Sequence, residues 1–119
     1  MNIKKEVENI TEQIINKYKP EKVIIFGSFA RNEFNKDSDI DFLIIKKDIA
    51  DYGIDRIREI SRLIERKTAV DFLIYKPDEI DKRLKLEDPF IKVIFEEGKV
   101  VYDKLSNNKR MDWKSRRRL

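Results

Sequence analysis

The sequence predicts an α+β domain in which a small mixed β-sheet is flanked by helices. Short apolar runs typical of buried strands alternate with longer segments whose apolar residues recur at helical spacing. The 119 residues are enough for one domain with one core, and 3 Gly and 3 Pro leave little room for flexible linkers. Because helices separate the strands, we expect them to cover one side of the sheet.

The first half of the chain is expected to hold two strands and two helices. Ile, Val and Tyr residues at helical spacing indicate a long first helix, and Pro20 closes it. A Gly-Ser pair ends the first strand, and a loop rich in Asn and Asp precedes the second. The elements expected here are a helix over residues 3–18, a strand over 22–26, a short helix over 28–31, a loop over 32–38 and a strand over 40–45.

The second half repeats the alternation. Asp78 and Asp88 are expected to cap two helices at their N-termini, with Pro89 at a first helical position, and Gly98 to end the second of them. The elements expected here are a helix over residues 52–66, a strand over 69–75, helices over 78–86 and 89–97, and a strand over 100–102. The helical residues assigned to the core, with a dimer or partner interface as the alternative for some of them, are Ile54, Ile57, Ile64, Val93 and Ile94, and Phe90 joins Val93 and Ile94 on the apolar face of the last helix.

Composition limits the chemistry. Cys and His are both absent, which removes thiolate nucleophiles and the commonest general base and transition-metal ligand. Catalysis would therefore depend on carboxylates, hydroxyls, amines and hard metal ions. No apolar run is long enough to cross a membrane, and residues 1–8 lack the apolar core of a signal peptide, so we expect a cytoplasmic protein.

Charge divides the chain at about residue 103. Residues 104–119 carry seven basic residues and one acidic residue, whereas the 20 basic and 22 acidic residues before them sum to −2. We therefore expect a domain over residues 1–103 and a basic tail over 104–119. Nucleic-acid binding by the domain is not indicated, although the tail, with Trp113 and Arg116 to Arg118, has the composition to touch RNA or an acidic partner. A solvated end is the alternative.

A Gly-Ser pair at the end of the first expected strand is suited to binding phosphate. Gly27 lets the backbone approach a ligand without a Cβ clash. Ser28 opens a short helix, whose free N–H groups and dipole favour an anion. Arg31 lies three residues on, near the same helix face, where its guanidinium could reach a phosphate oxygen. Taken alone, a Gly-Ser pair is more often a simple turn.

Three acidic residues are suited to holding metal ions. Asp39 and Asp41 share a face if both lie on one strand, and Asp71 joins them if its strand lies alongside. Three ionised carboxylates cannot lie so close unless divalent cations neutralise them, and oxygen ligands favour Mg²⁺ or Mn²⁺. Two such ions suit in-line displacement at phosphorus. Singly, Ser38-Asp39 could be a capping pair and Asp71 a solvent-facing acid on an edge strand.

The combined pattern resembles the DNA polymerase β-type nucleotidyltransferase superfamily. Gly27-Ser28, ten residues and then Asp39-x-Asp41 match its motif, and the fuller run Phe-Gly-Ser-Phe-Ala-Arg…Ser-Asp-Ile-Asp-Phe-Leu-Ile closely resembles its minimal nucleotidyltransferase branch. The resemblance covers residues 1–103. One departure is Asn32, where the family often has Gly; Asn tolerates a left-handed backbone.

The resemblance implies the following residue roles. Asp39, Asp41 and Asp71 would bind two Mg²⁺ ions, with Mn²⁺ as an alternative, and Asp71 would also help to activate the acceptor hydroxyl. The expected nucleotide-binding residues are Gly27, Ser28, Arg31 and Ser38.

The resemblance also implies the reaction, which is transfer of AMP from ATP to a hydroxyl. A short core implies that another polypeptide supplies the acceptor. The leading hypothesis is an antitoxin that adenylylates a tyrosine of a HEPN ribonuclease toxin, with which it forms a complex. The alternatives are a nucleotidyltransferase for an aminoglycoside-like molecule, faintly supported by Glu33, Asp37 and Glu65, and an antitoxin that masks its toxin without catalysis.

Overall fold

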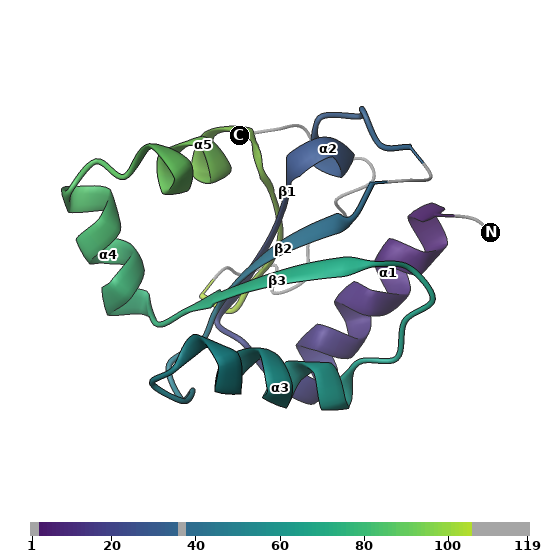
Figure 1. Ribbon diagram of the computed structural model, residues 1–119, viewed down its shortest axis with the longest axis horizontal. Coiled ribbons are helices and arrows are strands. Elements are labelled where there is room, and N and C mark those ends of the chain that lie inside the picture. The colour runs from purple at the N-terminus through teal and green to yellow at the C-terminus, as the bar shows by residue number, and fades with distance from the viewer. Residues whose placement is uncertain (1–2, 36–37, 106–119) are drawn as a thin grey trace.

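The computed structural model describes residues 3–35 and 38–105, and Figure 1 shows their arrangement. Four strands form one mixed sheet in the order β3-β2-β1-β4. The strands are β1 (Lys22–Phe26), β2 (Ile40–Ile45), β3 (Val70–Tyr75) and β4 (Lys99–Asp103). The helices are α1 (Ile3–Gln13), which continues as the π-helical turn η1 (Ile14–Tyr18), then α2 (Gly27–Ala30), α3 (Gly53–Leu63), α4 (Pro77–Lys85) and α5 (Pro89–Glu97). The expected α+β class and the order of its elements are confirmed.

Strand pairing decides which residues meet at the edge of the sheet. β1 runs antiparallel to β2 and to β4, whereas β2 and β3 are parallel and are connected through α3. In this register, Phe26 of β1 pairs with Asp41 of β2, and Asp41 pairs with Asp71 of β3. The end of β1 therefore lies beside the beginnings of β2 and β3.

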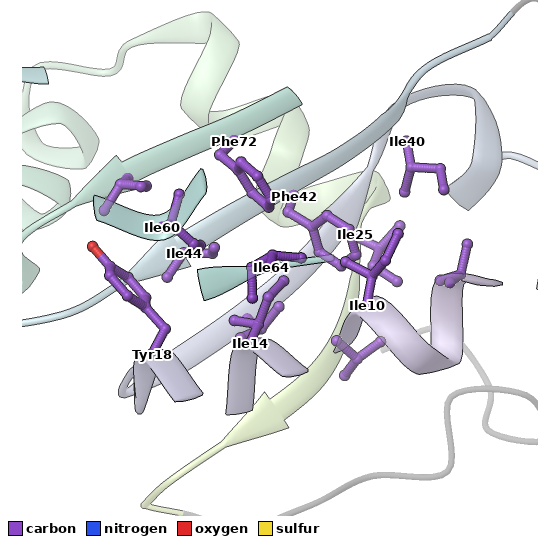
Figure 2. Packing of buried hydrophobic residues seen from close by; sticks show 14 of the residues in the cluster. Ile10, Ile14, Tyr18, Ile25, Ile40, Phe42, Ile44, Ile60, Ile64 and Phe72 are labelled. Carbon is purple, nitrogen blue, oxygen red and sulfur yellow. The ribbon is translucent and has the colours of Figure 1, made fainter. Parts of the chain in front are cut away.

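Helices pack on both faces of the sheet, so the expectation that they cover one side is wrong. On one face, Ile10, Ile14 and Ile60 pack with Phe42 and with other buried residues of the strands (Figure 2). On the opposite face, α4 and α5 contribute a second cluster, which contains Ile24, Leu43, Ile45, Ile80, Ile91 and Ile94. Both faces need cover because β2 is apolar on each of them, apart from one acid.

That acid is Asp41. Along β2, Phe42 and Ile44 belong to the cluster under α1 and α3, whereas Leu43 and Ile45 belong to the cluster under α4 and α5. Because side chains alternate along a strand, Asp41 lies on the α4 and α5 face, in line with Leu43. Asp71 lies in line with Leu73 on that same face.

The predicted N-terminal cap is correct for α5 and wrong for α4. Asp88 caps α5 as expected, because its carboxylate accepts hydrogen bonds from the backbone N–H groups of Phe90 and Ile91. The expectation that Asp78 caps α4 is wrong. The helix begins at Pro77, and the carboxylate of Glu79 accepts a hydrogen bond from the Lys76 backbone N–H at 2.8 Å. A proline at the first helical position needs no N–H partner there, which shifts the start by one residue.

Several apolar helical residues are more exposed than expected. Ile54 is 61% exposed, Phe90 is 53% exposed and Val93 is 45% exposed, so none belongs to the core. Ile64 and Ile94 are buried as expected, and Ile57 packs partly against the core. Helix α3 instead buries Arg56, which is only 5% exposed. Its guanidinium donates to both carboxylate oxygens of Glu79, at 2.8 and 2.9 Å.

The remaining expectations concern the ends of the chain and membranes. No helix among the described residues is long and apolar enough to span a bilayer. Most of the basic tail expected over residues 104–119 lies outside the described residues, since only residues 104 and 105 of it are described.

Candidate active site

A left-handed glycine turn brings the end of β1 against an acid of β2. Gly27 directly follows β1 and has a φ of +75°, a conformation that side chains other than glycine rarely adopt. A Cβ at position 27 would collide with the Asp41 carboxylate. We had expected Gly27 to let a ligand approach the backbone. In the structure it first makes room for Asp41, and glycine is therefore needed there for two separate reasons.

Asp41 and Asp71 lie side by side at the start of the parallel strand pair. They are direct register partners, and the two side chains are on the same face of the sheet. The Asp71 side chain is exposed, whereas Asp41 is half-buried between the strand pair and the Gly27 turn. Asp39 precedes β2 rather than lying on it, and its side chain is exposed. Asp39 thus lies just before the strand, as the expected bounds of residues 40–45 imply, and the condition stated for a shared face, that both acids lie on one strand, is not met.

The electrostatics of Asp41 reflect this crowding. The pKa of Asp41 is raised to about 6, chiefly by burial and also by the negative charges of Asp71 and Asp39 and by a hydrogen bond to Asp71. The positive charge of Arg31 acts in the opposite direction. A carboxylate held near other carboxylates and away from water costs free energy unless a cation is present.

These carboxylates suit a divalent cation in chemical type. They offer only oxygen donors, which Mg²⁺ and Mn²⁺ prefer, and their mutual repulsion is the kind of strain that a cation relieves. Within residues 3–35 and 38–105, however, no three acidic side chains are already gathered closely enough to form a complete metal cluster. The structure thus brings Asp41 and Asp71 together and leaves Asp39 as a nearby charge.

The residues expected to bind nucleotide surround the same turn. The Arg31 guanidinium forms ion pairs with Glu33 at 3.1 Å and with Glu97 of α5 at 3.7 Å. Ser28 is half-buried in α2, and its backbone carbonyl accepts a hydrogen bond from the Glu33 N–H at 2.9 Å. Ser38 lies in the loop before β2, where its hydroxyl accepts a hydrogen bond from the Asn35 N–H at 3.3 Å. These contacts hold the turn and the loop in place.

Asn32 adopts the left-handed conformation that we expected it to tolerate, with a φ of 61°. Its backbone N–H donates to the carbonyl of Phe29 at 3.2 Å, so the short helix α2 ends in an ordered turn without glycine.

The acids that faintly supported a small-molecule acceptor do not gather in one place. Glu33 is paired with Arg31 beside the glycine turn. Glu65 lies against Gln13 of α1, under the opposite face of the sheet, through backbone contacts of 2.7 Å. Asp37 lies outside the described residues.

Sequence reasoning missed two aromatic residues beside the acids. Phe26 was assigned only to a buried strand, yet it is the register partner of Asp41. Its ring contacts the ring of Phe90 of α5 edge to face, with centroids 6.1 Å apart. Strand alternation could have placed Phe26 on the same face as Asp41, but no local pattern indicates that α5 lies over it.

Comparison with known proteins shows the following similarities. The family model for "Polymerase beta, Nucleotidyltransferase" matches residues 8–107. A Methanocaldococcus jannaschii protein named "Putative protein adenylyltransferase" is 29% identical over 104 residues, covering 86% of this chain and 100% of the relative. A second protein of that name and organism is 36% identical over 98 residues, covering 80% of this chain and 89% of the relative.

One solved structure supports the fold. It is the crystal structure of a "putative nucleotidyltransferase" from Sulfolobus solfataricus, with a TM-score of 0.55 and 24% identity over 86% of each chain. At this level of identity, the likeness concerns the arrangement of strands and helices alone.

Proposed function

The chain belongs to the polymerase β nucleotidyltransferase family, in its minimal nucleotidyltransferase branch, and on that premise we propose that it transfers AMP from ATP to a hydroxyl group of a partner protein. The observation that carries this proposal is the pairing of Asp41 with Asp71 beside the Gly27 turn. The two M. jannaschii relatives carry the name of protein adenylyltransferases, which supports a protein as the acceptor. Residues 1–103 would form the catalytic domain and residues 104–119 a basic tail.

The three acidic side chains would have separate roles in the transfer of AMP. The acceptor oxygen would attack the α-phosphorus and form a new P–O bond, while the bond to the bridging oxygen breaks and pyrophosphate leaves. Asp71, the more exposed carboxylate, would accept the proton of the acceptor hydroxyl. Asp39, Asp41 and Asp71 would hold Mg²⁺ or Mn²⁺, which supplies positive charge to stabilise the entering and leaving oxygens.

The turn after β1 would position the triphosphate. Gly27 lies against Asp41, Ser28 follows it in α2, and Ser38 lies in the loop that leads to β2; the backbone N–H groups of the turn and the two hydroxyls would donate to phosphate oxygens. The positive charge of Arg31 acts on Asp41, and its guanidinium would exchange a carboxylate partner for a phosphate oxygen.

For the acceptor, we propose a tyrosine of a HEPN ribonuclease toxin. This chain would be the cognate antitoxin, and the two would form a complex in the cytoplasm. The support is the branch to which the chain belongs. Adenylylation of the toxin would add negative charge and bulk at its active site.

The test is transfer of label from [α-³²P]ATP to a co-expressed HEPN partner. We expect label on the partner with Mg²⁺ and none with a chelator or with Asp41→Asn. The Asp55→Asn variant, which changes an exposed side chain of α3, is a matched control that should retain transfer. Toxin neutralisation by Asp41→Asn without any label would instead support masking, and label on a small hydroxylated molecule but not on protein would support the small-molecule alternative.

A further inference from the structure

The aromatic ring of Phe90 stands beside the acids and has no role in the chemistry described so far. Phe26 and Asp41 are cross-strand partners, so their Cα atoms are separated by about 5 Å. The Phe26 ring lies on the α4 and α5 face, as Asp41 does, and packs against the second apolar cluster. Phe90 contacts that ring, with centroids 6.1 Å apart and planes 84° apart. Phe90 is therefore one ring contact away from the residue next to Asp41.

The backbone of Phe90 is fixed by the cap of α5, although about half of the residue is exposed. Its backbone N–H donates to the Asp88 carboxylate at 2.9 Å, and Arg83 holds that carboxylate from the other side at 2.9 Å. The next residues of α5 that face the sheet, Ile91 and Ile94, are almost fully buried and anchor the helix. The helix cap thus fixes the backbone of Phe90 and the Phe26 ring contacts its side chain, while the residue remains 53% exposed.

We infer that Phe90 is the platform on which the nucleobase of the donor nucleotide stacks, so that it favours purine over pyrimidine nucleotides. The inference rests on the proposed function, because it assumes that the triphosphate lies at Gly27 and Asp41. A base joined to that triphosphate extends away from the acids, and the contact between the Phe26 and Phe90 rings places an exposed aromatic ring beside the register partner of Asp41, on the same face of the sheet. Stacking on one aromatic face tolerates any base, but the larger purine ring gains more from it.

A nucleobase fits this surface better than a protein partner. Within α5, the exposed large apolar side chains are Phe90 and Val93, and two side chains bury far less area than a stable protein interface requires. A base needs only one accessible ring face. The edge-to-face contact with Phe26 leaves a face of Phe90 unobstructed by that neighbour, because in this geometry the planes are nearly perpendicular.

Calorimetric titration of the full chain in Mg²⁺ with two probes tests the inference. One probe is α,β-methylene-ATP, which binds without reacting, and the other is inorganic tripolyphosphate, which has no base. We expect Phe90→Leu to weaken binding of the ATP analogue about tenfold and to leave tripolyphosphate binding unchanged. Phe90→Tyr keeps the ring and should retain affinity, as should Val93→Ala on the same helix. The wild type should bind the ATP analogue more tightly than α,β-methylene-CTP, and Phe90→Leu should reduce the ratio of the two affinities.

The outcomes separate this inference from the proposed function. If neither probe binds the wild type, the proposed function fails. If both bind and Phe90→Leu weakens both equally, the ring acts structurally and the inference is overturned while nucleotide binding stands. If Phe90→Leu leaves both affinities intact and raises only the KM for the acceptor protein, Phe90 contacts the acceptor and the inference is again overturned.

Discussion

The carboxylate of Asp41 lies where a Cβ at position 27 would have to be, so the glycine of the turn and the acid of the strand depend on each other. Gly27 also has a φ of +75°, which a side chain would strain even without the collision. The turn that ends β1 and the carboxylate that begins β2 therefore form one unit. A change at either residue is expected to alter the other.

Gly27→Ala is expected to damage both stability and activity. The added methyl group must displace Asp41 and occupy a left-handed backbone conformation, which together should lower the free energy of unfolding by about 1–3 kcal/mol and abolish AMP transfer. Urea unfolding and the label-transfer assay measure the two effects. Gly53→Ala is the matched control, because a Cβ at Gly53 would meet nothing within 4 Å. If Gly27→Ala and Gly53→Ala lost the same stability and the same AMP transfer, the proposed steric dependence between Gly27 and Asp41 would be contradicted.

Asp41→Asn is expected to stabilise the metal-free protein while removing its activity. Burial and the charges of Asp71 and Asp39 raise the pKa of Asp41 to about 6, so at pH 7 its ionised form is held unfavourably. Since one pKa unit corresponds to about 1.4 kcal/mol and the side chain is only half-buried, we expect a gain of about 1–2 kcal/mol in chelator. Thermal unfolding measures it.

Mg²⁺ provides the complementary measurement. It should raise the Tm of the wild type and have little effect on Asp41→Asn, if Asp41 helps to hold the cation. Asp55→Asn, whose carboxylate forms only an exposed pair with Arg58 at 3.8 Å, should behave as the wild type. A loss of stability in Asp41→Asn without metal would show that the carboxylate is not strained.

The ion pair of Arg56 with Glu79 is expected to make stability depend on pH. The guanidinium of Arg56 holds the pKa of the Glu79 carboxyl below its usual value, chiefly through a hydrogen bond. Between the lowered pKa of the folded state and the ordinary glutamate pKa of 4.5, the folded state therefore binds fewer protons than the unfolded state. The contribution of this pair is fully present above about pH 4.5 and is lost as the pH falls through the lowered folded pKa.

Glu79→Gln tests this contribution. It leaves the nearly buried Arg56 charge without its partner and should lower the free energy of unfolding at pH 7 by about 1–3 kcal/mol. The difference from the wild type should shrink at pH 3, because below the ordinary glutamate pKa of 4.5 the unfolded state binds a proton that the ion pair opposes in the folded state. Urea unfolding at both pH values measures it. Arg58→Gln, which breaks an exposed pair with Asp55, is expected to change the free energy of unfolding by less than about 0.5 kcal/mol. An equal loss of stability in Arg58→Gln and Glu79→Gln would contradict a special role of the Arg56–Glu79 pair.

Arg31 is expected to exchange partners when nucleotide binds. Its present contacts are carboxylates, Glu33 at 3.1 Å and Glu97 at 3.7 Å, both substantially exposed to solvent. Arg31→Ala should weaken binding of α,β-methylene-ATP about tenfold, whereas Glu97→Gln should strengthen it slightly because one competing carboxylate is gone. Calorimetric titration measures both, with Arg58→Ala as the control. Weaker binding in Glu97→Gln would show that Glu97 positions Arg31 rather than competing for it.

Local chemistry explains what could be predicted. Asp88 before Pro89 has the side chain and the following residue that start a helix, and the structure confirms that start. Asn32 can adopt a positive φ, and it does so. In both cases the outcome depends on a residue and its immediate neighbours in the sequence.

Arg56 and Ile54 show where such reasoning fails. Helical spacing assigned Ile54 to the core, but in the first turn of α3 Arg56 is buried and Ile54 is exposed, although Ile57 and Ile60 still pack toward the core. Burial of an arginine requires acceptors, and these come from several separate segments, including the carbonyl of Ala50 at 2.6 Å, the carbonyl of Ile74 at 3.0 Å and the carboxylate of Glu79. No window of sequence around Arg56 contains all of them.

The sequence by itself determined the order and type of most elements, the glycine turn after β1 and the chemical nature of the acidic residues, because these follow from side-chain type and local spacing. Only the tertiary structure decided that β2 and β3 run parallel with Asp41 opposite Asp71, that Asp41 fills the space beside Gly27, and that α5 brings Phe90 onto Phe26. The physical reason is that strand register and helix placement are set by burying apolar side chains on both faces of one sheet at once. Burying both faces brings residues that are distant in the sequence into contact, and the candidate site consists of such residues.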